Sequence, residues 1–293
     1  MAAKRQAPTV RLRRLAAELR RLRAAAELTR DDVTARTGIN PATLYRIEKA
    51  RVQPQKRALV SLLDLYNVQE QQRGEILALL QGASDEGWLR PYHSELPEEY
   101  TAYISFEAEA RTVRNYESLF IPGLLQTEDY ARAVITGVLP MANPREIEQR
   151  VQARMERQAV LTKDDALQLW AIIDEAAVHR MVGGPKVMRE QLQHLRKAAA
   201  EPNLTLQIIP FSAGAHPGMP GSFVLMSFPD VDDPELIYID SMAGDLFLEA
   251  DVDVRRFGAI FDNLRAEALS PGATSKLLTT LAQEIEVGEE VTT

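Results

Sequence analysis

The sequence predicts an α+β protein in which a small all-α domain precedes a larger domain of helices and a mostly antiparallel sheet. Near the start, four leucines are spaced three and four residues apart, as on one face of an amphipathic helix. Further along the chain, helical periodicity alternates with short apolar runs whose hairpin-like links favour antiparallel strands. A stretch rich in Gly, Pro and charged residues separates the two patterns and predicts a connection.

These patterns divide the chain into four segments. We expect a helical domain at 1–82, a connection at 83–97, an α+β domain at 98–270 and a partly helical C-terminal tail at 271–293. Trp88 and Tyr92 lie in the connection, and their large rings indicate that it packs against other structure.

Charge is divided unevenly between the two ends of the chain. Residues 1–57 contain 15 Lys and Arg against 5 Asp and Glu, a net charge of +10. The totals of 34 and 42 leave 19 and 37 for residues 58–293, a net charge of −18. Such asymmetry predicts that a basic N-terminal domain binds a polyanion, while the rest is an acidic body.

The composition also excludes several classes of protein. There is no cysteine, so disulfides and thiolate metal sites are excluded, and a reducing cytoplasm is the natural setting. The first residues carry charges throughout, which is unlike a secretory signal. No run approaches the roughly 20 apolar residues of a membrane span. We therefore expect a soluble cytoplasmic protein without a membrane segment.

Two short helices are marked out by their capping residues. Thr29 is a good N-cap, and Asp32 three positions on makes an acidic variant of the capping box. Gly38 supplies the backbone freedom that ends this helix. Asn40 caps the next helix, and Pro41 takes its first position. Two short helices joined by a turn that contains Gly, with basic flanks, are typical of a helix-turn-helix.

Residues 12–68 resemble the five-helix DNA-binding domain of phage repressors and of the Xre family. The matching pieces are "LRRLR", "LT", "ARTGI", "TLYRIE" and "LLDLYNV". The resemblance implies a structural ion pair between Arg23 and Glu48, which links the first and third helices. It implies that Arg30 contacts a phosphate. Glu27 stands where relatives have a Gly that ends a helix.

The second short helix, from Asn40 to Ala50, is expected to lie in the major groove of double-stranded DNA. Arg46 is the best candidate for a bidentate guanine contact, worth roughly 1–3 kcal/mol of discrimination. The expected base contacts are Asn40, Ala42, Thr43 and Arg46. The expected phosphate contacts are Arg30, Arg51 and Lys56, which fix register rather than sequence. One small domain specifies little sequence, so we expect a homodimer on a two-fold related operator, associated with the nucleoid.

The body contains clear helix and strand signals. The helix signals include periodicity at 98–110, a helix capped by Thr127 and another capped by Asn143. The predicted strands are the runs "LQLWAIIDE", "NLTLQIIPF", "SFVLMSFP", "LIYIDS" and "LFLE", with "VRNYESLFIP" as a further extended piece.

We find no pattern of catalytic residues in the body. Glu175 and His179 are spaced like helical metal ligands, but no third ligand is in view. The remaining histidines, His93, His194 and His216, belong to no motif. There is no GxSxG elbow, phosphate loop or calcium loop. We therefore expect no enzyme activity, no catalytic residue, no metal and no cofactor.

Three arginines form a basic stripe on a predicted helix of the body. Arg150, Arg154 and Arg157 share one helix face. One interpretation is a docking surface for a partner. The other, which we favour, is pairing within the helix with its glutamates, Glu146, Glu148 and Glu156.

The body resembles the C-terminal domain of the actinobacterial WhiJ-type (Scr-like) Xre regulators. The matching stretches are "FIPGLLQTEDYARAVI", "RVQARMERQAVL", "IIDEAAVHRMVGGPKVMREQLQHL" and "NLTLQIIPFSAGAHPGMPGSFVLMSFPD". The resemblance implies a transcription factor, often a repressor. It also implies a small BldB-like protein, encoded nearby, as a partner in a toxin–antitoxin-like pair. The biochemical role of this domain is undefined in the family.

Three roles for the body follow. It is a protein-interaction and dimerisation domain that controls DNA binding, a small-molecule sensor, or part of an autoregulating antitoxin. We favour them in that order, and the sequence leaves repressor and activator both open.

Overall fold

The computed structural model describes residues 10–82, 96–229, 233–241 and 244–292. Most of the expected connection at 83–97, with Trp88, Tyr92 and His93, lies outside the described residues. The chain forms two compact units, Met1–Phe106 and Glu107–Thr293. Helix α6 (Glu98–Glu109) spans the division between them.

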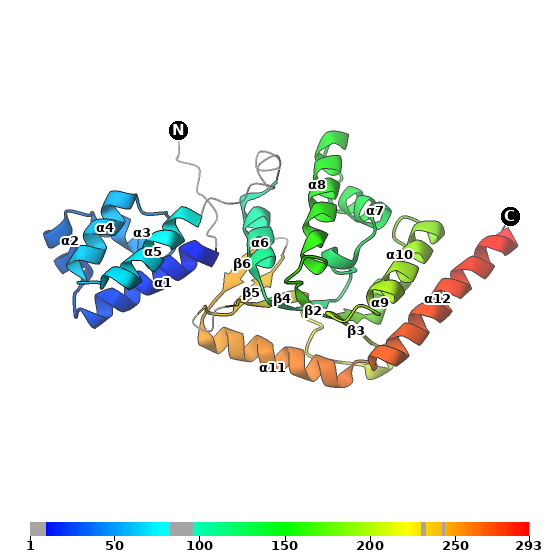
Figure 1. Cartoon of the computed structure of the whole chain (residues 1–293). Helices are drawn as coiled ribbons and strands as arrows, with labels where there is room; N and C mark the ends of the chain where they lie inside the picture. Colours follow the sequence, from blue (N-terminus) through cyan, green and yellow to red (C-terminus); the bar gives the residue numbers. More distant parts are fainter. Residues whose placement is uncertain (1–9, 83–95, 230–232, 242–243, 293) are drawn as a thin grey trace. The chain divides into compact units, whose positions relative to one another are not determined.

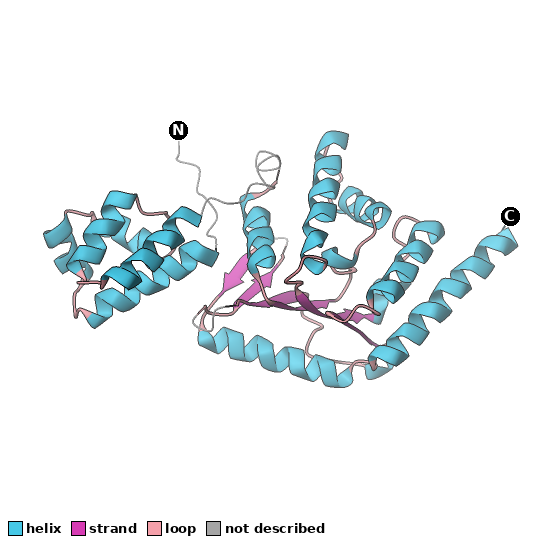
Figure 2. Cartoon of the chain, in the orientation of Figure 1, coloured by secondary structure: helices cyan, strands magenta, loops and turns pink. Residues whose placement is uncertain are grey.

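The first unit begins with a bundle of five helices (Figures 1 and 2). These are α1 (Val10–Ala25), α2 (Arg30–Thr37), α3 (Pro41–Glu48), α4 (Lys56–Leu65) and α5 (Glu70–Gly82). Their apolar faces meet in one core. Six leucines of α1, α3 and α4 are completely buried in it: Leu15, Leu19, Leu44, Leu59, Leu62 and Leu63. The all-α N-terminal region predicted from the sequence is confirmed.

The caps predicted for α2 and α3 are confirmed. Thr29 and Asp32 form the reciprocal capping box, with the Thr29 N–H donating to Asp32 Oδ2 over 2.9 Å. Gly38 ends α2 with φ of +72°, a conformation that Gly adopts without steric cost. The Ala42 N–H donates to Asn40 Oδ1 over 2.9 Å at the start of α3. These caps fix the turn between the two helices.

The second unit is built on a six-stranded sheet with the order β3-β2-β1-β4-β5-β6. Its strands are β1 (Thr112–Glu117), β2 (Gln168–Asp174), β3 (Leu204–Ile209), β4 (Phe223–Ser227), β5 (Leu236–Ile239) and β6 (Leu246–Leu248). The strands β2 to β6 fall within runs that the sequence analysis predicted to be extended, and β1 begins one residue before its run. The α+β class is therefore confirmed for this unit as well.

The sheet is mixed, with more parallel pairing than the sequence analysis expected. β1 pairs with β2, and β2 with β3, in parallel, whereas the β1–β4, β4–β5 and β5–β6 pairs are antiparallel. Helices connect β1 to β2 and β2 to β3, and such crossovers return the chain in the same direction. Only the later strands are joined by short links.

Helices cover both faces of the sheet (Figure 1). The connecting helices are α7 (Glu128–Val138), α8 (Pro144–Arg157), α9 (Glu175–His179) and α10 (Pro185–Ala198). On the opposite face, α11 (Asp251–Glu267) packs Phe261 and Leu264 against Tyr116, Ile172 and Leu225 of the sheet. Thr127 and Asn143 cap α7 and α8, as predicted.

The segment after α11 closes the β3 edge of the sheet. Leu269 N–H donates to the Ile208 carbonyl over 2.8 Å, and Ile208 N–H donates to Thr274 Oγ1 over 3.2 Å. Thr274 and Leu278 are buried within α12 (Pro271–Thr292), which lies beside α10 (Figure 1). The sequence analysis placed 271–293 in a partly helical C-terminal tail, and in the structure Thr274 of this segment contacts β3.

Among the described residues, no helix has both the length and the hydropathy that crossing a lipid bilayer demands.

We predict that Glu27→Gly stabilises the helical unit by roughly 1 kcal/mol, because Glu27 has φ of +54°, where a side chain is strained. The gain is measured as slower hydrogen exchange in α1 and α2 of the full chain. Glu75→Gly, at an exposed position inside α5, is the matched control and is expected to destabilise by about 1 kcal/mol. Equal destabilisation by both changes would contradict the role of the backbone conformation.

Candidate nucleic-acid interface

Helix α3 has one buried side and one exposed side. Leu44 and Ile47 are buried in the core of the helical unit, and Glu48 is fully buried beside them. The other side of the helix presents the candidate base contacts, of which Thr43 is half-buried and the rest are exposed: Asn40, Ala42, Thr43 and Arg46. A helix in this position has a solvent-facing side that is free for a ligand.

Three of the four candidate base contacts lie together on α3. Arg46 Nε donates to the Ala42 carbonyl and Arg46 Nη2 donates to Thr43 Oγ1, each over 3.3 Å. Both bonds are long and exposed, so little energy holds the guanidinium against the helix. Asn40 differs, because its side-chain carbonyl already accepts the capping bond of α3, while its amide group can donate to other partners.

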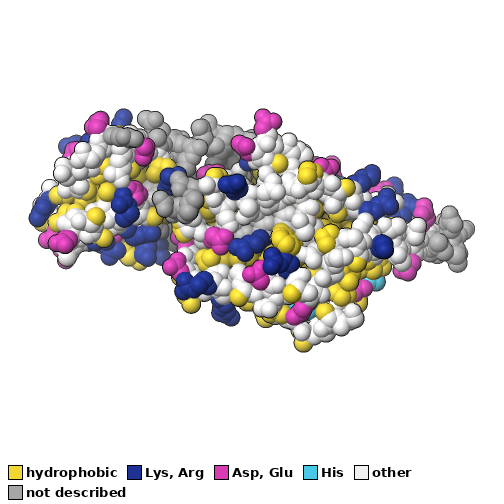
Figure 3. All heavy atoms as spheres, turned by 60° about the horizontal axis from the view of Figure 1, so that its bottom comes forward, with side chains coloured by type: hydrophobic (Ala, Val, Ile, Leu, Met, Phe, Trp, Pro, Cys, Tyr) yellow, Lys and Arg dark blue, Asp and Glu magenta, His cyan; other side chains and the backbone are white. Residues whose placement is uncertain are grey.

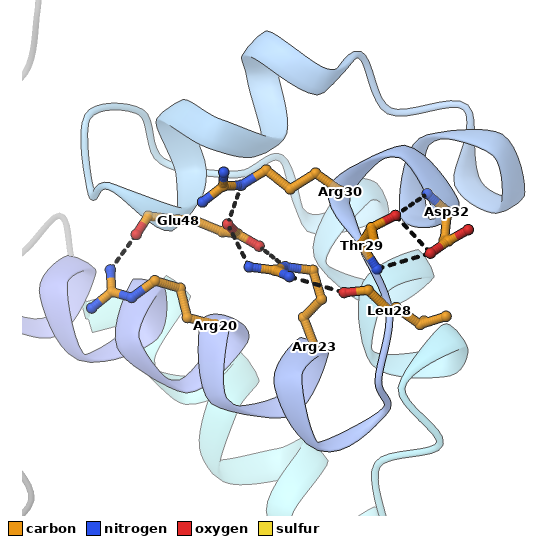
Figure 4. A network of polar contacts seen from close by, with 7 residues as sticks. All are labelled: Arg20, Arg23, Leu28, Thr29, Arg30, Asp32 and Glu48. Carbon is orange, nitrogen blue, oxygen red and sulfur yellow. Dashed lines mark hydrogen bonds and ion pairs between the residues drawn. The ribbon is translucent and has the colours of Figure 1, made fainter.

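Glu48 joins three helices through charged hydrogen bonds (Figure 4). Arg23 Nε of α1 donates to Glu48 Oε1 over 2.5 Å, and Arg30 Nε of α2 donates to Glu48 Oε2 over 2.7 Å. Arg20 donates to the Glu48 carbonyl, and Arg23 Nη1 donates to the Leu28 carbonyl over 2.9 Å. The hydrogen bond to Glu48 raises the pKa of Arg23. The structure thus pairs Arg23 with Glu48 and adds two further arginines.

Arg30 serves this network, although the sequence analysis assigned it only a phosphate contact. Its Nε is bonded to Glu48, and its Cζ lies 5.3 Å from the centre of the Tyr45 ring. The side chain is still 38% exposed. Arg30 can therefore offer its terminal amino groups to an anion while Nε stays on the buried carboxylate.

Arg51 and Lys56 lie in and after the loop that follows α3. The Arg51 N–H donates to the Arg46 carbonyl over 2.8 Å, so its backbone is fixed to the end of the helix. Lys56 is the first residue of α4, and both side chains are exposed. Lys and Arg side chains gather on the lower part of the helical unit in the space-filling view (Figure 3).

Sequence reasoning missed Arg20 and Tyr45. Arg20 lies three residues before Arg23 on the same helix face, and that spacing is the signal that it also reaches Glu48. Tyr45 is 39% exposed on α3 and lies near the guanidinium groups of both Arg30 and Arg51. An exposed aromatic side chain on a helix with basic neighbours is the corresponding signal for Tyr45.

The arginines of α8 do not form one accessible stripe. Arg150 pairs with Glu146 over 2.9 Å, one turn away in the same helix. Arg154 Nη1 donates to Gln126 Oε1 over 2.9 Å. Arg157 is only 5% exposed and pairs with the buried Glu107. Its guanidinium is therefore part of the interior of the domain and offers no surface to a partner.

Glu148 and Glu156 were expected to pair with arginines of their own helix, α8. Glu148 pairs with Arg132 of α7, not with an arginine of its own helix. This bond lowers the pKa of Glu148. Glu156 is exposed on the same helix. Pairing within α8 is thus observed for Arg150 and Glu146.

The body contains an unusual carboxyl group that the sequence does not reveal. Burial raises the pKa of Glu117, at the end of β1, to about 7, against the opposing effect of hydrogen bonds from Ser222 and Asn115. Two histidines of the body lie beside carboxylates. His179 Nε2 is 3.2 Å from Glu175 Oε1, and His216 Nε2 is 3.2 Å from Asp174 Oδ2.

These histidine–carboxylate pairs are separate contacts. In the described part of the chain, no three His, Asp or Glu side chains are grouped so that they could hold a metal ion.

The arrangement of α2 and α3 defines a helix-turn-helix protein, and comparison with known families agrees. Residues 14–76 match the family described as "Helix-turn-helix domain", which indicates a DNA-binding regulator in general and not the WhiJ type in particular. Residues 100–280 match the family described as "Domain of unknown function (DUF5753)". Because that match covers more than half of the chain, the protein belongs to this family. Neither the curated proteins nor the solved structures yield a match to the chain.

We predict that Glu48→Ala destabilises the helical unit by about 3 kcal/mol, because it removes the buried partner of two guanidinium groups. The loss is measured as a lower free energy of unfolding in denaturant. Asp64→Ala is the matched control, since Asp64 is 61% exposed in its pair with Arg73 and surface pairs contribute about 0.5 kcal/mol. Similar small losses in both variants would contradict the role of Glu48.

Proposed function

We propose that the protein is a sequence-specific DNA-binding transcriptional regulator that acts as a repressor. The observation that carries this proposal is the exposed side of α3, where Ala42, Thr43 and Arg46 lie together. The buried Glu48 network fixes the position of this helix. The net charge of +10 over residues 1–57 supports DNA as the ligand, since phosphates supply most of the attraction.

In the proposed complex, α3 lies in the major groove with its N-terminal half toward the base edges. Arg46 leaves its two long hydrogen bonds and donates to the O6 and N7 atoms of a guanine. Thr43 and the amide group of Asn40 reach a base or a phosphate, and Ala42 contacts a thymine methyl group. The weakness of the bonds that hold Arg46 in the free protein supports its release to DNA.

Phosphate contacts surround this helix in the proposal. Arg30 at the start of α2, Arg51 after α3 and Lys56 at the start of α4 hold the DNA backbone on the flanks of α3. Such contacts set the register of the protein on the duplex without reading its sequence. The exposed side chains of these residues support this role.

We also propose that the protein binds as a homodimer and that the body controls DNA binding through a small BldB-like protein. One helix-turn-helix unit reads few base pairs, so two copies on a two-fold related operator supply the needed specificity. The resemblance of the body to WhiJ-type regulators supports such a partner. Any such effector must bind the DNA-competent and incompetent states unequally. Of the proposed partner surface on α8, Arg150 and Arg154 remain partly exposed.

We predict that Arg46→Ala removes the preference for operator over random DNA, because the guanine contact contributes roughly 1–3 kcal/mol of discrimination, about 5- to 150-fold. The operator is first selected from a random pool with the full-length protein, and affinities are measured by fluorescence anisotropy. Lys56→Ala is expected to weaken binding to both DNAs by a similar factor. Arg145→Ala, on the exposed start of α8, is the control and changes neither affinity.

Two outcomes would contradict this proposal. Equal losses on both DNAs for Arg46→Ala would show that Arg46 contacts only phosphate. A wild-type protein that holds no duplex even at low salt would exclude DNA binding altogether.

We predict that the full-length protein, purified from its own cells, retains a small protein encoded beside its gene. Adding the recovered partner to the selected duplex is expected to change DNA affinity about 5- to 150-fold, the usual range of coupling between two sites. A gel-shift with and without the partner measures the change. Stabilisation by a metabolite, with no partner retained, would instead favour the small-molecule sensor.

A further inference from the structure

Tyr45 lies near two basic side chains that come from different parts of the helical unit. The Cζ of Arg30, at the start of α2, is 5.3 Å from the centre of the Tyr45 ring. The Cζ of Arg51, in the loop after α3, is 5.9 Å from the same centre. Both distances are within the range in which a guanidinium is attracted to the negative face of an aromatic ring.

The Arg30 guanidinium is held from two directions. Its Nε donates to Glu48 Oε2 over 2.7 Å, while the ring of Tyr45 lies against the group. A planar guanidinium fixed at Nε directs its two terminal amino groups in a defined direction. The Arg30 side chain stays 38% exposed, so it is accessible to a ligand.

Arg51 has its backbone fixed and its side chain exposed. Its N–H is bonded to the Arg46 carbonyl, which places the residue directly at the end of α3. Its guanidinium lies near the ring of Tyr45, with Cζ 5.9 Å from the ring centre. Without the ring, this long side chain is free to sample many rotamers and loses entropy when it binds.

The charges around Tyr45 leave an excess of positive charge. The Glu48 carboxylate is shared by Arg23 and Arg30, so this group of three carries a net charge of +1. Arg51 adds another positive charge on the same ring. Two guanidinium groups brought to one ring repel each other, and an anion between or beside them relieves that repulsion.

We propose that Tyr45 is a positioning residue that holds Arg30 and Arg51 as one phosphate-binding unit on the DNA backbone. This inference rests on the proposed function and deepens it, because it makes two expected phosphate contacts depend on one ring. The ring organises the two guanidinium groups before DNA arrives, and it does so without a hydrogen bond from the Tyr45 hydroxyl.

The experiment compares wild-type protein with Tyr45→Phe, Tyr45→Leu and Tyr45→Ala in the full chain. Binding to a fluorescein-labelled duplex of arbitrary sequence is followed by anisotropy over a series of salt concentrations. Each phosphate contact contributes about 0.9 to the slope of log affinity against log salt. We expect Tyr45→Ala and Tyr45→Leu to bind roughly tenfold more weakly at low salt, with a slope shallower by about one unit. Tyr45→Phe keeps the ring and is expected to match the wild type.

A second measurement tests the positioning in the absence of DNA. The Nε–Hε resonances of Arg30 and Arg51 in the free protein report the nearby ring through its ring current. They are expected to shift in Tyr45→Leu and to stay close to the wild-type positions in Tyr45→Phe. Because Tyr45 is partly exposed, all three variants are expected to fold, and circular dichroism checks this.

The outcomes separate this inference from the proposed function. Wild-type binding with an unchanged slope in Tyr45→Ala would overturn the role of Tyr45 alone. Equal losses in Tyr45→Phe and Tyr45→Ala would overturn it too, because they would assign the contact to the hydroxyl. Absence of wild-type binding at low salt would overturn the proposed function itself.

Discussion

The buried carboxylate of Glu48 is the interaction on which the helical unit depends. A charge removed from water must be paired and hydrogen-bonded, and both oxygens of Glu48 are satisfied, one by Arg23 and one by Arg30. These bonds come from α1 and α2, while Glu48 itself ends α3. The relative positions of three helices are thus tied to one group. In the proposed complex with DNA this support matters, because a small rotation of α3 would move every contact at once.

In the proposed complex with DNA, the same network joins stability to recognition. Arg30 belongs both to the pair that holds α2 and to the surface beside α3. Tyr45 then extends this fixed arrangement from the interior to Arg51 in the next loop. The buried Glu48 carboxylate positions the Arg30 guanidinium, which lies near the Tyr45 ring, and this ring in turn lies near the exposed Arg51 side chain. Arg23, Arg30 and Arg51 are therefore connected through Glu48 and Tyr45 and are not independent charges.

Much of this architecture could be predicted from the sequence, and the exceptions have physical reasons. The caps formed by Thr29, Gly38 and Asn40 depend only on neighbouring residues, so the sequence predicted them. The parallel pairing of β1 with β2 could not be predicted in this way, because it depends on where segments distant in the sequence meet. The burial of Arg157 was hidden for the same reason, since its partner Glu107 lies 50 positions away in the chain. Tyr45 was overlooked because its neighbours come from another helix and a loop.

The closed edge of β3 limits how another protein can join the body. The Ile208 carbonyl and N–H of β3 are already bonded to Leu269 and Thr274, so an incoming peptide cannot pair with Ile208. At the opposite end, β6 is only three residues long. In strand addition, a partner extends a sheet through main-chain hydrogen bonds. Both edge strands of this sheet offer few backbone groups for such pairing. We therefore expect recognition of the body to use side chains from its helices and loops, where binding residues are common.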